Sequence, residues 1–364
     1  MREPSEDRRR RIMAVVQARG AARVSDLASE LEVSVVTVRR DVEELAQAGK
    51  LRRGHGVARS IGQARAVTVP RADPAPTQVW GGVVALVVPE RHAYLNEIVH
   101  GARLALEEAG MRPALHLAPR AVGAERPLVE RVLADGALGL LIAPRWRTVE
   151  TEEADYAWLA GVTVPTVLME RRSRRGSALH AVDSACTDHW YGVHLAVDHL
   201  VSLGHRRIVF AARDDSPTAR ALRTAFADIA AGRPEVEDWT VVLSAPDAGP
   251  DPVRHPGPDV EMAAVLREHR ATAALMHGDT NALMLVQQLA DAGVRVPEDC
   301  SVVAYDDVVA ALGSTPLTAV APPKEEVGRA AAELVLGRLG GSARPPRRVE
   351  LLPTLQVRGS TQVR

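Results

Sequence analysis

The sequence predicts an α/β fold for most of the 364-residue chain, preceded by a small helical domain. Three observations lead to this prediction. Short apolar runs alternate with helical patterns after residue 82, two short amphipathic helices lie between residues 25 and 47, and an irregular segment containing prolines separates the two regions. A chain of this length is expected to form about two to three domains. Its hydrophobic content of 46% and charged content of 25% are typical of a globular protein.

Two short helices with clear starts are predicted near the N-terminus. Ser25 precedes the first, in which Leu27 and Leu31 share one face, and Ser34 is an N-cap candidate for the second. The apolar stripe of the second helix consists of Val38, Val42 and Leu45. A preceding helix within residues 5–20 can complete their core.

The other face of the second helix is polar and basic. Burying the apolar stripe directs Val36 and Arg40 outward, with Thr37 and Arg39 beside them. Residues 1–60 hold 13 basic and 9 acidic side chains, whereas the whole chain has a net charge of −1, so the positive charge is local. These side chains fit a DNA major groove. The alternative is a three-helix bundle whose arginines form only a solvated face.

Residues 6–58 resemble the N-terminal winged helix-turn-helix of the DeoR family. The segment SVVTVRRDVEELAQAGKLRRGHG stands where that family carries its T-[IV]-R-R-D-L and R-x-H-G-G signature, although Val57 replaces a second wing glycine. The resemblance implies a DNA-binding domain at residues 1–58 with a wing at 50–58. The DNA-binding residues that it implies are Ser34, Val36, Thr37, Arg39, Arg40, Arg52, Arg53 and His55.

Residues 59–81 are predicted to form a flexible linker. The segment contains Pro70, Pro74 and Pro76 and lacks any usable periodicity. Because proline disrupts the interior of a helix, we do not expect this linker to form a hinge helix.

The remaining chain alternates between strand and helix patterns. Apolar strand runs are predicted at residues 83–88, 115–118, 139–143, 166–169, 207–212 and 301–305, with helices such as 97–109 between them. This alternation is typical of parallel sheets, which bind ligands at the carboxyl ends of their strands. The loops at residues 89–94, 144–147 and 214–218 follow directly after predicted strands.

Three segments of this region resemble the effector-binding domain of the lactose-repressor (LacI/GalR) family, which has the fold of periplasmic sugar-binding proteins. They are residues 198–212, 290–307 and 315–339. The resemblance implies a ligand-binding domain over residues 82–364, with two α/β lobes, three crossovers and dimerisation through this body. By analogy, lobe one comprises 82–180 and 321–345, and lobe two comprises 181–320 and 346–361.

The same resemblance implies a ligand site between the lobes. Its implied residues are Tyr94, Arg145, Trp146, Thr218, Arg220 and Asp306. An aromatic ring can stack on a sugar or base, a carboxylate can accept from hydroxyls, and an arginine can donate to oxygens. Each residue has an alternative role: the aromatics can belong to the core or its rim, and Arg220 to a helix surface. His205 and Asp188 are interpreted as a packing residue and a helix-start residue.

The sequence departs from that family at several positions of the cleft. Leu222 and Gly278 stand where the family usually has an arginine and an asparagine, so the ligand of the sugar repressors cannot be transferred to this chain. Arg145 and Arg147 leave open an anionic effector such as a sugar phosphate. Lysine occurs only at Lys50 and Lys324, and we attribute this bias to the codon composition of the source.

Other classes of protein lack support in the sequence. There is no signal peptide and no apolar run near 18 residues, so we expect a cytoplasmic protein. Cys186 and Cys300 suggest neither a disulfide framework nor a metal site. The sequence contains no phosphate-binding motif and no nucleophile motif, so we expect neither an enzyme nor a bound cofactor.

We therefore expect a homodimeric, sequence-specific DNA-binding regulator, more specifically a repressor. A small polar effector, such as a sugar or a sugar derivative, would control its operator affinity. The alternative is an intracellular sugar-binding protein or a sugar-acting enzyme with a vestigial DNA-binding head.

Replacing Arg40 with alanine tests the reading helix. If Arg40 contacts a base, Arg40→Ala should weaken operator binding by about 1–3 kcal/mol, measured at fixed salt. Unchanged operator affinity in Arg40→Ala would contradict the assignment.

Loss of Arg52 and Arg53 should instead weaken binding to all DNA sequences alike. It should also lower the slope of log affinity against log salt concentration by about 1 for each lost phosphate contact.

Overall fold

The chain forms two compact units, Met1–Pro76 and Thr77–Arg364, in a computed structural model. The structure describes residues 8–9, 11–13, 15–16, 21–31, 33–47, 50–54, 57–60, 81–90, 93–119, 121–244, 260–341 and 344–364. Residues 61–80, which make up most of the predicted linker, lie outside this description, as does His55. Within the described part of the chain, no helix is both long and apolar enough to cross a membrane.

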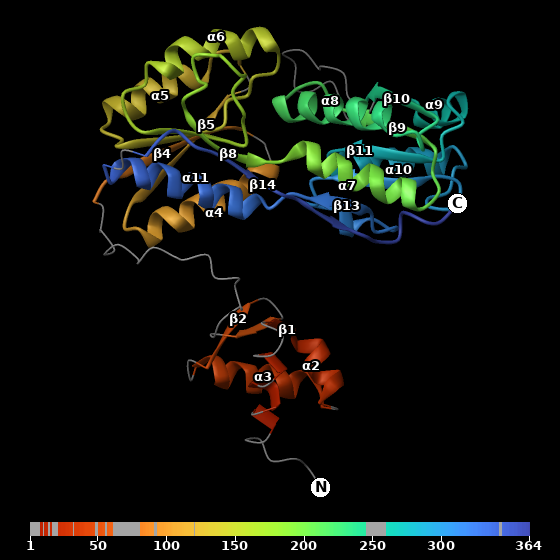
Figure 1. The fold of residues 1–364 in the computed structure, drawn as a ribbon. Coiled ribbons are helices and arrows are strands. Elements are labelled where there is room, and N and C mark those ends of the chain that lie inside the picture. Colours follow the sequence, from red (N-terminus) through yellow and green to blue (C-terminus); the bar gives the residue numbers. More distant parts are fainter. Residues whose placement is uncertain are drawn as a thin grey trace. The chain divides into compact units, whose positions relative to one another are not determined.

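The first unit is a helix-turn-helix with a small antiparallel sheet (Figure 1). Residues 8–9, 11–13 and 15–16 are helical. The other elements are α2 (Val24–Glu30), α3 (Val35–Gln47), β1 (Ala21–Arg23), β2 (Leu51–Gly54) and β3 (Val57–Ser60), with the strand order β1-β3-β2. Both predicted helices and the wing hairpin are confirmed. Strand β1 was not predicted, because three residues are too few to show an alternation of apolar and polar side chains.

The apolar stripe of α3 is buried as predicted. Its stripe residues and those of the neighbouring helices form one core, which includes Ile12, Val16, Leu27, Leu31, Val38, Val42 and Leu45. The Ser34 hydroxyl accepts a hydrogen bond from the Thr37 amide at 3.2 Å, which confirms Ser34 as an N-cap. The carboxylate of buried Asp41 pairs with Arg8 at 2.5 Å and Arg9 at 3.1 Å, so it ties α3 to the first helical segment.

The second unit contains two lobes, each with a six-stranded sheet between helices (Figure 1). The sheet of lobe one is parallel throughout and runs β14-β8-β7-β6-β4-β5. Its strands are β4 (Val83–Pro89), β5 (Arg112–Ala118), β6 (Gly139–Ile142), β7 (Thr166–Met169), β8 (Asp183–Thr187) and β14 (Arg348–Leu351). Helices α4 (Ala93–Glu108) and α11 (Lys324–Leu339) cover one face, and α5 (Glu125–Ala134) and α6 (Val149–Ala160) cover the other.

The sheet of lobe two runs β10-β9-β11-β12-β13-β15, and only its last pair is antiparallel. Its strands are β9 (Arg207–Ala212), β10 (Asp238–Leu243), β11 (Ala273–His277), β12 (Ser301–Tyr305), β13 (Thr318–Ala321) and β15 (Thr354–Gln356). Helices α7 (His189–Ser202) and α8 (Pro217–Gly232) cover one face, and α9 (Met262–Glu268) and α10 (Asp279–Asp291) cover the other. A short 3-10 helix, η1, spans Ala310–Leu312.

Two predicted boundaries need correction. Strands β8 and β14 pair with the sheet of lobe one, so lobe one extends past the predicted ends at residues 180 and 345. The sequence DSACT of β8 is buried but consists of small and polar residues, and it therefore lacks the apolar run used to find strands. Strand β3 also pairs through Arg59 and Ser60, so the linker begins after Ser60 rather than at residue 59.

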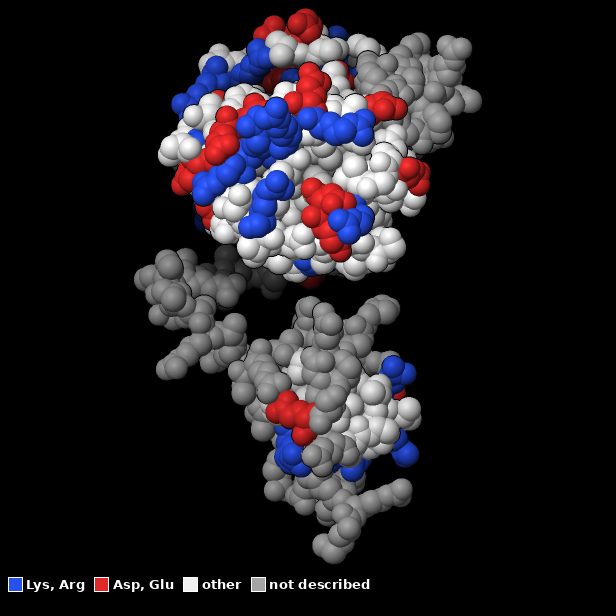
Figure 2. Space-filling view, turned by 90° about the vertical axis from the view of Figure 1, so that its right-hand side faces the viewer, with Lys and Arg blue, Asp and Glu red and all other residues white. Residues whose placement is uncertain are grey.

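Two residues with ambiguous roles are structural. The Asp188 carboxylate caps α7 by accepting from the Tyr191 amide at 2.9 Å, which confirms its helix-start role. His205 is buried and bonds to the hydroxyls of Thr272 at 2.8 Å and Ser301 at 2.9 Å, which confirms it as a packing residue. On the surface shown in Figure 2, basic and acidic side chains of this unit lie side by side, as on a solvated face of mixed charge.

Helices α4 and α11 pack with their backbones almost in contact. A Cβ atom added at Gly328 would lie 1.9 Å from the Ile98 carbonyl oxygen, and one added at Gly101 would lie 2.0 Å from that of Glu325. Only glycine permits this approach, because both clashing atoms belong to the backbone and cannot rotate away.

Adding a methyl group at Gly328 should therefore destabilise the second unit. Overpacking typically costs about 1–3 kcal/mol, and denaturant unfolding of Gly328→Ala should show a loss at or above this range. Gly337→Ala on the same helix is the control. Its nearest neighbour would be an arginine side-chain atom at 4.0 Å, so the variant should equal or exceed the wild type in stability. Equal stability of both variants would contradict the close contact.

Candidate functional site

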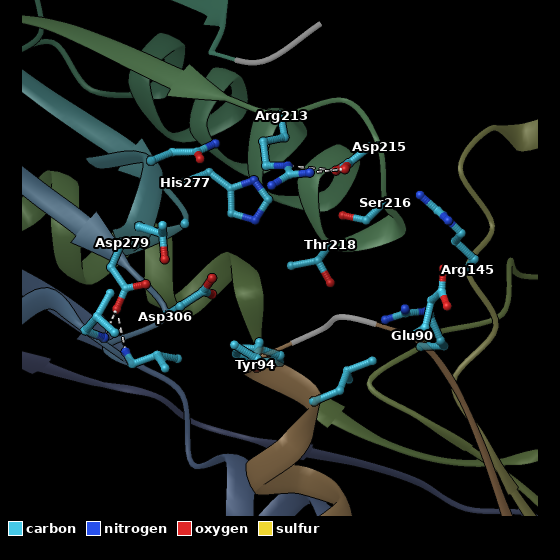
Figure 3. A pocket seen from close by; sticks show the side chains of 18 residues that line it. Glu90, Tyr94, Arg145, Arg213, Asp215, Ser216, Thr218, His277, Asp279 and Asp306 are labelled. Carbon is cyan, nitrogen blue, oxygen red and sulfur yellow. Dashed lines mark hydrogen bonds and ion pairs between the residues drawn. The ribbon is translucent and has the colours of Figure 1, made fainter. Parts of the chain in front are cut away.

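A cavity of about 360 Å³ lies between the two lobes, where the carboxyl ends of their strands meet (Figure 3). Its polar and charged lining residues are Glu90, Tyr94, Arg145, Arg171, Arg213, Asp215, Ser216, Thr218, His277, Asp279, Thr280, Asn281 and Asp306. This location is where open parallel α/β sheets bind ligands. The volume lies in the range of pockets for small molecules.

Tyr94, near the start of α4, forms part of the lobe-one wall. Its hydroxyl donates to the Glu170 carboxylate at 2.6 Å and lies 3.3 Å from the Thr187 hydroxyl. Burial raises the pKa of Tyr94, and the negative charges of Glu170 and Asp306 raise it further. The phenol therefore stays neutral, and its hydrogen bond to Glu170 fixes the position of its ring at the cavity.

Glu170 follows β7 and is held by groups from both lobes. It accepts from the Thr187 amide at 3.0 Å, and its other oxygen lies 3.2 Å from His189 Nε2. The second nitrogen of His189 lies 3.1 Å from the Tyr305 hydroxyl in lobe two. Burial has the largest effect and raises the pKa of Glu170, but the contacts with His189, Tyr94 and Thr187 together outweigh burial and lower the pKa. Glu170 is thus an ionised residue with contacts to both lobes.

Two carboxylates in lobe two have different roles. Asp279 accepts from the backbone amides of Val308 and Val309 at 2.5 Å and of Ala310 at 3.1 Å, so it organises the loop after β12. Asp306 points toward the cavity in Figure 3, and among the described residues no group donates a hydrogen bond to its carboxylate. Its pKa is raised well above the ordinary value, first by burial and then by the charge of Asp279.

The arginines of the cavity are largely engaged by the protein. Arg213 pairs with Asp215, and Arg171 donates to the backbone carbonyls of Pro144 and Glu170. Burial lowers the pKa of Arg171 to about 10, so it remains charged at neutral pH. The described cavity therefore holds two carboxyl groups that receive no hydrogen bond from the protein, those of Glu90 and Asp306, and burial raises the pKa of Asp306.

Four of the six residues predicted to bind ligand line this cavity: Tyr94, Arg145, Thr218 and Asp306. The other two, Trp146 and Arg220, lie outside its lining and line two adjoining cavities, so their role in binding stays a prediction. Trp146 is only 2% exposed and donates from its indole nitrogen to Asp155 at 3.0 Å, so it packs beneath α6.

Arg220 joins the lobes instead of facing the cavity. From α8 of lobe two it donates to the carbonyls of Trp146 and Arg147, both at 2.7 Å, and to the Glu152 carboxylate at 2.9 Å. Its guanidinium is thereby committed to lobe one. Arg147 does not line this cavity either, so the charge it was expected to offer an anionic effector lies elsewhere.

Other lining residues were not identified from the sequence. Glu90 and Arg213 each follow a strand directly, Arg171 is the second residue after β7, and His277 ends β11. The rule that ligands bind at strand ends could have found them. Asn281 lies one turn into α10, and its buried side-chain nitrogen has no hydrogen-bond partner among the described residues, so it is a further donor at the cavity.

The predicted DNA-reading residues of α3 are accessible. Val36 is 74% exposed and the Arg40 side chain 84% exposed, and Arg39 is exposed as well. Ser34 and Thr37 lie together at the helix start, where their hydroxyls are 2.8 Å apart. Arg52 and Arg53 lie on β2, but their side chains, like His55, fall outside the described part of the chain.

The cavity can bind a polar molecule through the carboxyl groups of Asp306 and Glu90 and through several donors. Among the described residues, no group of three or more His, Cys, Asp or Glu side chains is placed to hold a metal ion. A molecule with several hydroxyls matches the Asp306 carboxylate, the Asn281 amide and the Thr218 hydroxyl.

Asp306→Asn should stabilise the protein at neutral pH. Because the pKa of Asp306 is raised in the folded state, its favourable contribution to the free energy of unfolding is complete below the unfolded-state pKa. This contribution is lost as the pH rises through the folded-state pKa. The asparagine variant does not ionise and therefore does not lose stability in this way. Its melting temperature should exceed that of the wild type at pH 8, by about 2–4 °C for each kcal/mol, and the difference should shrink toward pH 4. Exposed Asp299→Asn, which removes an ion pair with Arg295, should show no such gain. A constant difference across this pH range would contradict the assignment to Asp306.

Two domain models match the chain. A DeoR-like helix-turn-helix domain matches residues 8–64, and a periplasmic binding protein-like domain matches residues 197–361. These matches agree with the helix-turn-helix unit and with lobe two and the C-terminal strands.

The chain is also similar to bacterial regulators over most of its length. It is 28% identical to the HTH-type transcriptional regulator reg1 of Streptomyces lividans, over 93% of this chain and 96% of that protein. It is 26% identical to the arabinose metabolism transcriptional repressor of Geobacillus stearothermophilus, over 85% of this chain and 82% of that protein.

Solved structures show the same fold. One is a LacI family regulator from Enterococcus faecium with bound ribose. The match covers 77% of this chain and 99% of that chain, with a TM-score of 0.59 and 20% sequence identity. Another is the lac repressor dimer bound to operator and the anti-inducer ONPF. The match covers 78% of this chain and 95% of that chain, with a TM-score of 0.62 and 21% sequence identity. The chain is thus a transcriptional regulator that joins a DeoR-like helix-turn-helix domain to a periplasmic binding protein-like body with the LacI fold.

Proposed function

We propose that this regulator is a repressor that binds operator DNA through α3, and that a small hydroxylated molecule in the interlobe cavity controls this binding. The observation that carries the proposal is the Asp306 carboxylate, which faces the cavity without a hydrogen-bond donor from the described protein. A buried acceptor of this kind is costly unless a ligand supplies donors. The two hydroxyls of a diol can supply them.

A neutral sugar or polyol fits this cavity better than a sugar phosphate. Arg213 is neutralised by Asp215, and Arg171 is used by two backbone carbonyls. A phosphate would also lie near the negative charge of Asp279, which disfavours another anion in the cavity. The ribose bound to the Enterococcus faecium regulator supports the sugar class.

We infer that the ligand is bound and not converted, because the described cavity residues offer hydrogen-bond acceptors and donors without an activated nucleophile. Sugar-acting enzymes remain the contrasting class. Two copies of the chain would place two α3 helices on the half-sites of one operator, in keeping with the lac repressor dimer on its operator. Such a regulator works where the chromosome is, in the cytoplasm.

The proposal is tested with the full chain. Genomic fragments that the protein retains would first identify an operator, and sugars and polyols would then be screened for a change in operator affinity. Asp306→Asn should raise the effector concentration needed for half-response by at least ten-fold and leave operator affinity without effector unchanged, because the two sites are coupled only through conformation.

Asp299→Asn, an acid-to-amide change on the exposed surface, is the matched control and should behave as the wild type. Retention of no DNA fragment, or consumption of a sugar by the purified protein, would overturn the proposal.

A further inference from the structure

Lysine is almost absent from this chain. Of its 45 basic residues other than histidine, only Lys50 and Lys324 are lysine. The codon bias that we inferred from the sequence explains why arginine is preferred, but it does not explain why residue 324 escaped the preference. An explanation must come from what surrounds Lys324.

Lys324 is the first residue of α11 and is only 5% exposed. Its ammonium donates to the backbone carbonyl of Asp306 at 2.6 Å and lies 5.7 Å from the centre of the Tyr94 ring. A Glu97 oxygen lies 3.8 Å away. Lys324 does not line the cavity itself, but it contacts two residues that do.

The contact with Asp306 joins the lobes. Tyr94 lies on α4 and Lys324 on α11, which are held together by the close backbone contact at Gly101 and Gly328. Asp306 belongs to lobe two, directly after β12. The ammonium therefore connects a rigid pair of helices in lobe one to the cavity carboxylate of lobe two.

The backbone that Lys324 holds is in an unusual conformation. Asp306 has a φ of 106° and Asp307 a φ of 50°, values that residues other than glycine rarely adopt. The Asp307 carboxylate is held by Arg358 at 2.7 and 3.0 Å. Such backbone persists only where its surroundings enforce it, and Lys324 supplies one of the side-chain contacts that do so here, beside those of Arg358 and Asp279.

The site also favours a lysine over an arginine. An ammonium is a compact charge on a flexible stem and can donate to one carbonyl from beneath an aromatic ring. A planar guanidinium is larger and presents several donors that need acceptors of their own.

We propose that Lys324 is the positioning residue of the effector cavity. It fixes the strained backbone of Asp306 against Tyr94. The orientation of the ligand-binding carboxylate then depends on how the two lobes are placed relative to each other. This inference rests on the proposed role of Asp306 in binding the effector. It adds a residue that acts without touching the ligand.

The charges around Asp306 give the proposal a spectroscopic readout. Asp279 on α10 and Glu170 after β7 raise the pKa of the Asp306 carboxyl beyond the effect of burial, whereas Lys324 on α11 and Arg213 after β9 lower it. Titration of Asp306 should therefore change the electric field at the Lys324 ammonium.

The first experiment uses the full chain labelled with carbon-13 at the lysine Cε atoms. Because the chain has only two lysines, the NMR spectrum contains two signals, and Lys50→Arg assigns them. Between pH 4 and pH 9 the Lys324 signal should shift with a midpoint above the usual aspartate range. The shift should disappear in Asp306→Asn, and the exposed Lys50 should not follow it in either protein. A Lys324 signal that is indifferent to Asp306→Asn overturns the proposal.

The second experiment measures amide hydrogen exchange in residues 305–310. Lys324→Met should exchange at least ten-fold faster there, and Lys324→Arg should not restore the wild-type rate, because a planar guanidinium does not replace the compact ammonium between Asp306 and Tyr94. Arg329→Met is the matched control, since it removes an ion pair with Glu108 from the exposed side of the same helix. Wild-type exchange in Lys324→Met or in Lys324→Arg overturns the proposal.

Neither experiment requires an effector or an operator. A failure of the proposed function, such as a cavity that binds no sugar, is therefore distinguishable from a failure of the Lys324 assignment. The NMR experiment also stands if Lys324→Met does not fold, because it uses only Lys50→Arg, Asp306→Asn and the wild-type protein.

Discussion

The close backbone contact between α4 and α11 is the constraint on which the cleft depends. Gly101 and Gly328 allow the two helices to approach until carbonyl oxygens occupy the space of a side chain. The pair then behaves as one body, with Tyr94 at the start of one helix and Lys324 at the start of the other. Because interiors are close-packed, this body moves as a unit, and its contacts with lobe two define how the cleft is set.

Much of the architecture could be predicted because it rests on local patterns. The stripe of α3 and the cap at Ser34 fix the helix-turn-helix, and apolar runs mark the central strands of both lobes. Six strands of the two lobes were not predicted, namely β8, β10, β11, β13, β14 and β15. Strand β8 is short and polar in sequence, and β15 is a three-residue edge strand. Their pairing is decided by tertiary contacts, which no local pattern records.

The cleft was predictable in position but only in part in composition. Asp306 and Tyr94 follow from strand ends and family resemblance, and both line the cavity. Trp146 and Arg220 occupy similar places in the sequence, yet one is turned into the core with a φ of 37° and the other reaches across to lobe one. Side-chain direction depends on backbone conformation at single residues, and the sequence does not determine it at loops of this kind.

The bonds of Arg220 have a consequence for the speed of response. Three hydrogen bonds from this side chain hold lobe two to lobe one. If a molecule enters from this side, these bonds must break first, and the rate of entry would then be governed by that opening step and not by diffusion. Re-formation of the bonds would delay departure in the same way. The regulator would then average over brief fluctuations in effector concentration and respond to sustained ones.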